Sequence, residues 1–80
     1  MRESVDAQTA ADNAEMEQAE SLLRKLTRRE ERVLRMRFGI GTEARQLNEI
    51  GRGLGIATTS VRRIQRRAVQ RLRLLASNEP

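Results

Sequence analysis

The sequence predicts an all-α fold, a four-helix domain whose last two helices form a C-terminal helix-turn-helix. The most informative stretch is residues 47–73, where a short segment of helical periodicity stops at a glycine. A longer segment follows, with six arginines and no acidic residue. This order is typical of a helix-turn-helix, in which one short helix supports a second that enters the DNA major groove. The apolar spacing elsewhere is also helical, and no alternating pattern predicts a strand.

Eighty residues are enough for one domain with a small core. We expect this domain to span residues 12–76, where apolar residues keep a helical period. Residues 1–11 are polar and lack such a period, so a disordered or linker segment is expected there. Residues 77–80 are expected to form a frayed tail.

The first helix is predicted at about residues 13–25. Asp12 or Asn13 can cap its start, and its early acidic residues and late Arg24 and Lys25 suit the helix dipole. Its apolar residues share one face and are Met16, Ala19, Leu22, Leu23 and Leu26.

The second helix, at about residues 28–37, has a clear start and stop. Thr27 and Glu30 have the spacing of a capping box, in which each side chain accepts a hydrogen bond from the backbone of the other. Gly39 ends the segment. Its apolar residues are Val33, Leu34, Met36 and Phe38.

The third helix is predicted at residues 46–53 from the spacing of Leu47, Ile50 and Leu54. Gln46 is a poor N-cap residue, and Gly51 and Gly53 weaken the helix by roughly 1 kcal/mol each relative to alanine. Small residues at these positions have a structural purpose if a neighbouring helix crosses closely.

The fourth helix is predicted at residues 58–75, after a turn in which Gly55 supplies the left-handed residue. One face is apolar, and the remainder carries the six arginines. The apolar face consists of Val61, Ile64, Ala68, Leu72 and Leu75.

The composition argues against catalysis and against a bound cofactor. The chain has no histidine, cysteine or tyrosine, no phosphate-binding loop and no nucleophile paired with a base. We therefore expect no enzymatic activity, no metal, no cofactor and no small-molecule substrate. No apolar run approaches the length of a membrane span, so a cytoplasmic protein without a membrane partner is expected.

The charge pattern indicates a polyanionic partner. Residues 1–26 carry three basic and six acidic side chains, whereas residues 27–80 carry 13 basic and five acidic ones. A basic module of this kind usually binds nucleic acid, although a solvated arginine-rich surface gives the same composition.

The fourth helix supplies the candidate DNA contacts. Residues near the start of a recognition helix reach base edges and later ones meet phosphates. The candidate base readers are therefore Thr58, Thr59, Arg62 and Arg63, and the candidate phosphate contacts are Arg66, Arg67 and Arg71. The alternative is a basic amphipathic helix for a membrane surface or a partner protein. Because Phe38 is the only aromatic residue, duplex DNA is favoured over membrane insertion or single-strand stacking.

Two motifs resemble region 4 of the bacterial primary sigma factors. They are LTRREERVLRMRFGI at residues 26–40 and LNEIGRGLGIATTSVRRIQRRAVQRLR at residues 47–73. The family patterns are L-T-x-R-E-x-x-V-L-x-x-R-F-G and T-L-x-E-[IV]-G, followed by V-[ST]-x-E-R-[IV]-R-Q-I-[EQ]-x-x-A-L-x-[KR]-L-R. The resemblance covers roughly 50 of the 80 residues.

This resemblance implies a bacterial, nucleoid-associated subunit of RNA polymerase that reads the minus-35 promoter element. Gln46 and Arg52 join the expected phosphate contacts. The resemblance further implies that the first half holds the flap of the polymerase beta subunit, and that an anti-sigma factor or activator can target the module. It assigns jointly to the core and to this partner surface the apolar residues Leu22, Leu26, Val33, Leu34 and Phe38.

The chain departs from the family at the expected base readers. The family has Arg-Glu where this chain has Thr58 and Thr59, and glutamine where it has Arg63. Two functions therefore stay open: a divergent sigma factor with its own promoter preference, or a sigma-like adaptor that binds polymerase or a regulator with little sequence reading. The chain is expected to be either an excised C-terminal domain or a stand-alone protein. A repressor-like dimer is a third alternative, but no second apolar face supports one.

Overall fold

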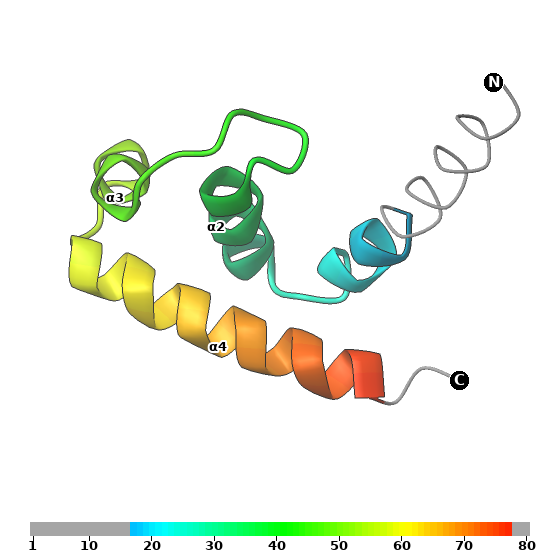
Figure 1. Cartoon of the computed structure of the whole chain (residues 1–80). Coiled ribbons are helices and arrows are strands. Elements are labelled where there is room, and N and C mark those ends of the chain that lie inside the picture. Colours follow the sequence, from blue (N-terminus) through cyan, green and yellow to red (C-terminus); the bar gives the residue numbers. More distant parts are fainter. Residues whose placement is uncertain (1–16, 78–80) are drawn as a thin grey trace, which may run out of the picture.

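The computed structural model describes residues 17–77, which form helices joined by short turns and loops and contain no strand (Figure 1). Residues 17–23 are helical, and α2 (Arg28–Phe38), α3 (Leu47–Leu54) and α4 (Thr58–Ser77) follow. The predicted all-α, helix-turn-helix fold is confirmed. The start of the first predicted helix and the 1–11 segment lie outside the described residues. The last helix continues to residue 77, so it is two residues longer than predicted.

The ends of α2 form as its sequence predicts. The Thr27 hydroxyl oxygen accepts from the Glu30 N–H at 3.2 Å, and the Glu30 carboxylate accepts from the Thr27 N–H at 3.0 Å. Gly39 closes the helix in the left-handed region, with φ 71°, and its N–H donates to the Arg35 carbonyl. The capping box and the glycine together fix the length of α2.

The start of α3 is better satisfied than Gln46 alone predicts. Glu49, three residues later, accepts a hydrogen bond from the Gln46 backbone N–H at 3.0 Å. This carboxylate also lies in the first turn of the helix, where negative charge suits the dipole. Glu49 therefore compensates for the poor N-cap residue.

The two glycines inside α3 have different surroundings. A Cβ added at Gly51 would lie 2.7 Å from the Ile56 carbonyl oxygen and 3.3 Å from Cγ2 of Val61, whereas one added at Gly53 would meet nothing within 4 Å. The expected close approach is therefore present at Gly51 and absent at Gly53. Gly55 adopts φ 73° and ends α3. Gly51 and Gly55 together let the chain turn back so that α4 packs against α3.

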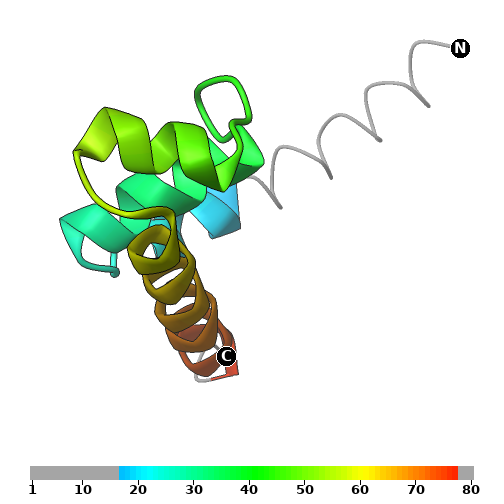
Figure 2. The ribbon, with the colours of Figure 1, turned by 90° about the vertical axis from the view of Figure 1, so that its left-hand side faces the viewer.

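The core consists of two apolar clusters, and both α2 and α4 contribute to each. The first contains Leu23, Leu26, Leu34 and Ala68, and the second contains Val33, Ile50 and Val61. Val61 and Ala68 are fully buried, so this side of α4 is fixed against the other helices. In Figures 1 and 2, α4 runs past α3, α2 and residues 17–23 in turn, with its opposite side uncovered.

None of the helices in residues 17–77 is long and apolar enough to cross a membrane.

Candidate nucleic-acid interface

The exposed side of α4 carries the expected base readers. Thr59, Arg62 and Arg63 are exposed in the first two turns, and Thr58 is half-buried at the first position. Arg66 is exposed one turn further along. Since Val61 and Ala68 occupy the core side, these residues lie on the side that a groove of DNA can approach.

The guanidinium groups near the start of α4 have no ion-pair partner in the described part of the chain. Among residues 17–77, no acidic side chain pairs with Arg62, Arg63 or Arg66. The first turn of α4 also has no acidic residue, and Ala57, whose carbonyl accepts the first helical hydrogen bonds, has no side-chain oxygen for a cap. The positive end of the helix dipole and the arginines therefore add to one another without local neutralisation.

A hollow beside α4 brings in an arginine that the sequence did not single out. Arg37 of α2 lines it together with Arg62, Arg66 and Arg73 of α4, and its volume is about 420 Å³. Leu47, at the start of α3, is also part of its wall. Four guanidinium groups from two helices thus surround one concave surface. Only the packing of α2 against α4 creates this arrangement, and no local motif predicts it.

The other expected phosphate contacts are not on this side. Arg67 and Arg71 line a second hollow, of about 280 Å³, against Arg29 and Glu30 of α2. The Arg71 guanidinium lies 3.8 Å from the Glu30 carboxylate, so its charge is partly balanced. Nearby on α2, Arg28, Arg29 and Arg32 line a further hollow against the end of α3. The exposed stripe of Thr59, Arg62, Arg63 and Arg66 on α4 therefore has an arginine-lined hollow on each flank.

Gln46 is the N-cap residue of α3 and Arg52 lies within this helix, and both side chains are exposed. Neither residue lines the hollows beside α4.

An apolar groove lies between α2, the C-terminal part of α4 and residues 17–23. Its volume is about 310 Å³. Of the five residues expected to contact a partner, Leu22, Leu34 and Phe38 line this groove, and Phe38 is 54% exposed. Leu26 and Val33 do not line it. They are 7% and 0% exposed because they pack inside the two core clusters, so they take the core part of that joint assignment.

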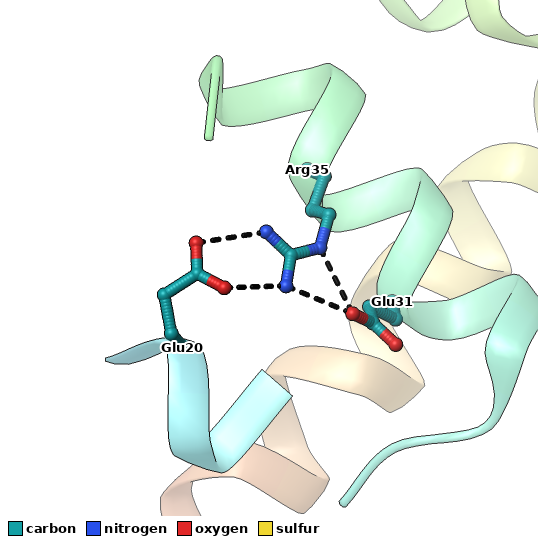
Figure 3. A network of polar contacts seen from close by, with 3 residues as sticks. All are labelled: Glu20, Glu31 and Arg35. Carbon is teal, nitrogen blue, oxygen red and sulfur yellow. Dashed lines mark hydrogen bonds and ion pairs between the residues drawn. The ribbon is translucent and has the colours of Figure 1, made fainter. Parts of the chain in front are cut away.

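Arg35 forms ion pairs with two carboxylates, those of Glu20 and Glu31 (Figure 3). The Arg35 guanidinium donates to both carboxylate oxygens of Glu20, at 2.9 and 2.7 Å, and to Glu31 at 2.9 Å. These bonds hold the pKa of Glu20 below its usual value and raise that of Arg35 further above neutrality. Because Glu20 belongs to the first helix, the network attaches that helix to α2 beside the apolar groove.

Comparison with known proteins identifies the family. The sequence model of the family "Sigma-70, region 4" matches residues 22–74. The RNA polymerase sigma factors SigA of Listeria monocytogenes and Listeria innocua are both 41% identical over 76 residues, which is 89% of this chain and 20% of theirs. SigA of a Bacillus species is similar to the same extent. The chain spans about a fifth of the length of these curated relatives. No solved structure matches it.

The fold and the basic face of α4 define a helix-turn-helix protein of the DNA-binding class. The chain belongs to the sigma-70 region 4 family, a family of non-catalytic domains from sigma factors. The resemblance that residues 26–40 and 47–73 indicated is therefore confirmed.

Proposed function

We propose that this domain reads the minus-35 promoter element through α4, as part of a sigma factor that works with RNA polymerase. The observation that supports this most strongly is the uncovered stripe of Thr59, Arg62, Arg63 and Arg66, opposite the side on which Val61 and Ala68 are fully buried. A helix can lie in a major groove only if it has such a side, and free guanidinium groups suit both phosphates and base edges.

The proposed roles follow position along α4. Thr58, Thr59, Arg62 and Arg63 contact base edges because they come first into the groove. The phosphate contacts are Gln46, Arg52, Arg66, Arg67 and Arg71, to which the hollow beside α4 adds Arg37. With Arg37 on one flank and Arg67 on the other, both DNA strands that border the groove have a basic neighbour.

The apolar groove supports the second half of the proposal, a contact with the flap of the polymerase beta subunit. Leu22 and Phe38 give it an apolar rim at the surface and the buried Leu34 forms part of its wall, so an amphipathic helix of a partner fits there. An anti-sigma factor or an activator would compete for the same surface. With these partners, we propose that the protein acts in the bacterial cytoplasm, at the nucleoid.

Duplex binding and its dependence on salt test the DNA contact. Six phosphate contacts would lower the logarithm of the binding constant by about five for each tenfold rise in salt. Arg62→Ala should cost roughly 1–3 kcal/mol at one base position while other positions keep their preference. If the binding constant for promoter-containing duplexes did not change with salt concentration, this would contradict the proposal.

An adaptor without sequence reading is the second candidate, and the apolar groove is the observation that favours it. It predicts that a flap-tip peptide binds while promoter duplexes bind no better than random ones. Phe38→Ser provides the matched variant, because Phe38 is exposed and its loss should weaken the peptide without unfolding the core. Peptide binding together with sequence-preferring duplex binding would leave only the sigma-factor function.

A further inference from the structure

We infer that the base-reading surface of α4 selects guanine-containing duplexes, with Arg62 and Arg63 each binding a guanine of a different base pair and Thr59 contacting a thymine methyl group. This inference rests on the proposed function, since it names the sequence class that the same surface reads.

The positions of the three side chains on α4 support separate base contacts. Thr59 precedes Arg62 by three residues and Arg63 by four, so all three are neighbours on the exposed side of the first two turns. Consecutive helix residues point about 100° apart, because a turn holds 3.6 residues. The two guanidinium groups therefore diverge from the helix and reach different base pairs.

The chemistry available on α4 restricts which bases these contacts can be. Arginine bonds the two acceptors of guanine, whereas cytosine needs a carboxylate acceptor and adenine needs an amide. Residues 58–77 contain no aspartate or glutamate. The nearest amide, Gln65, is half-buried and lines the hollow beside Leu47. The first two turns of α4 thus offer guanidinium and hydroxyl groups alone to the bases.

Arg62 and Arg63 are available for this contact, whereas Arg35 and Arg71 have carboxylate partners. Arg35 is held by two carboxylates and Arg71 lies 3.8 Å from Glu30. Within residues 17–77, no such partner has to be displaced before Arg62 or Arg63 reaches a base. Within the described residues, a contact with guanine therefore breaks no ion pair of Arg62 or Arg63.

A selection from randomised duplexes at low salt tests the inference, using the 80-residue chain, Arg63→Gln and Arg67→Gln. The wild-type pool should be enriched in guanine at two positions, each by about tenfold or more over other bases. Arg63→Gln should change one of them from guanine to adenine, because an amide suits adenine. Arg67→Gln is the matched control: it should weaken binding to all sequences about equally and keep both guanines.

The outcomes separate the inference from the function on which it rests. Duplex binding with no guanine enrichment, or with both guanines retained by Arg63→Gln, would overturn the inference and leave DNA binding intact. Loss of all duplex binding by the wild-type chain would overturn the proposed function as well. Circular dichroism of the two variants confirms that α4 is still folded, so a changed preference reports a changed contact.

Discussion

Arg35 of α2 and the arginines near the start of α4 are chemically identical, but they occupy opposite environments. Arg35 on α2 makes three hydrogen bonds to two carboxylates and is 24% exposed, whereas Arg62 and Arg63 on α4 are exposed and have no ionic partner among residues 17–77. The difference comes from the acidic residues around them: Glu31 lies one turn before Arg35, while α4 contains no acidic residue at all. In this arginine-rich chain, we therefore infer which arginines bind DNA from the carboxylates around each one, and not from the number of charges.

The largest effect is expected from removing the free guanidinium groups together. The triple variant Arg62→Gln, Arg63→Gln, Arg66→Gln should bind promoter duplexes about 100-fold more weakly or worse, since each base or phosphate contact contributes roughly 1–3 kcal/mol. Its free energy of unfolding in urea should stay close to that of the wild type, because these side chains make no ion pair with any of residues 17–77. If the triple variant unfolded at a lower urea concentration but kept its DNA affinity, these arginines would stabilise the fold and not bind DNA.

The next largest effect concerns the turn that positions α4. Gly51→Ala should destabilise the fold by roughly 1–3 kcal/mol, because the added methyl group lies 2.7 Å from a backbone oxygen that cannot easily move. Gly53→Ala is the matched control, with open space around it, and should stabilise α3 by up to about 1 kcal/mol. Urea denaturation measures both. Equal effects at the two glycines would contradict the close crossing of α3 and α4.

Removing the bound arginine should affect stability and not recognition. Arg35→Gln should lower the free energy of unfolding by about 1 kcal/mol, since the network is partly exposed and leaves Glu20 and Glu31 close together without a cation. Duplex affinity, measured under conditions where the variant is folded, should change less than twofold. A large loss of affinity would mean that Arg35 leaves its carboxylates to bind DNA.

The smallest effect is a change in acid stability. The hydrogen bond from Arg35 is the main cause that holds the pKa of Glu20 below its usual value of 4.5. A lowered folded-state pKa contributes stability above pH 4.5, and this contribution is lost as the pH falls below 4.5 and through the folded-state value. Thermal unfolding of Glu20→Gln should therefore show a shallower loss of stability in this range. An equal loss of stability below pH 4.5 in the wild type and in Glu20→Gln would contradict the pairing of Glu20 with Arg35.

Much of the fold could be predicted from the sequence because its signals are local. The Thr27–Glu30 capping box and the glycines at 39 and 55 fixed the ends of helices to within two residues. The buried side of α4 followed from the spacing of Val61, Ile64 and Ala68. Each of these features depends on residues a few positions apart, where helix geometry alone decides the neighbours.

The parts that the sequence did not predict depend on packing between helices. Arg37 joins Arg62 and Arg66 only because α2 crosses α4, and Arg67 lies on the other flank for the same reason. Leu26 and Val33 have the same apolar character as Leu22, so periodicity could not separate buried core from groove lining. The ion pair of Glu20 with Arg35 joins residues 15 positions apart, and no motif signals it.

The most direct test of the comparison is an NMR titration that follows arginine Nε–Hε signals as a promoter duplex is added. We expect the signals of Arg62, Arg63 and Arg66 to shift or broaden at the first additions, while that of Arg35 stays in place on its two carboxylates. Movement of Arg35 with no change at Arg62 and Arg63 would contradict the assignment of α4 as the DNA-binding surface.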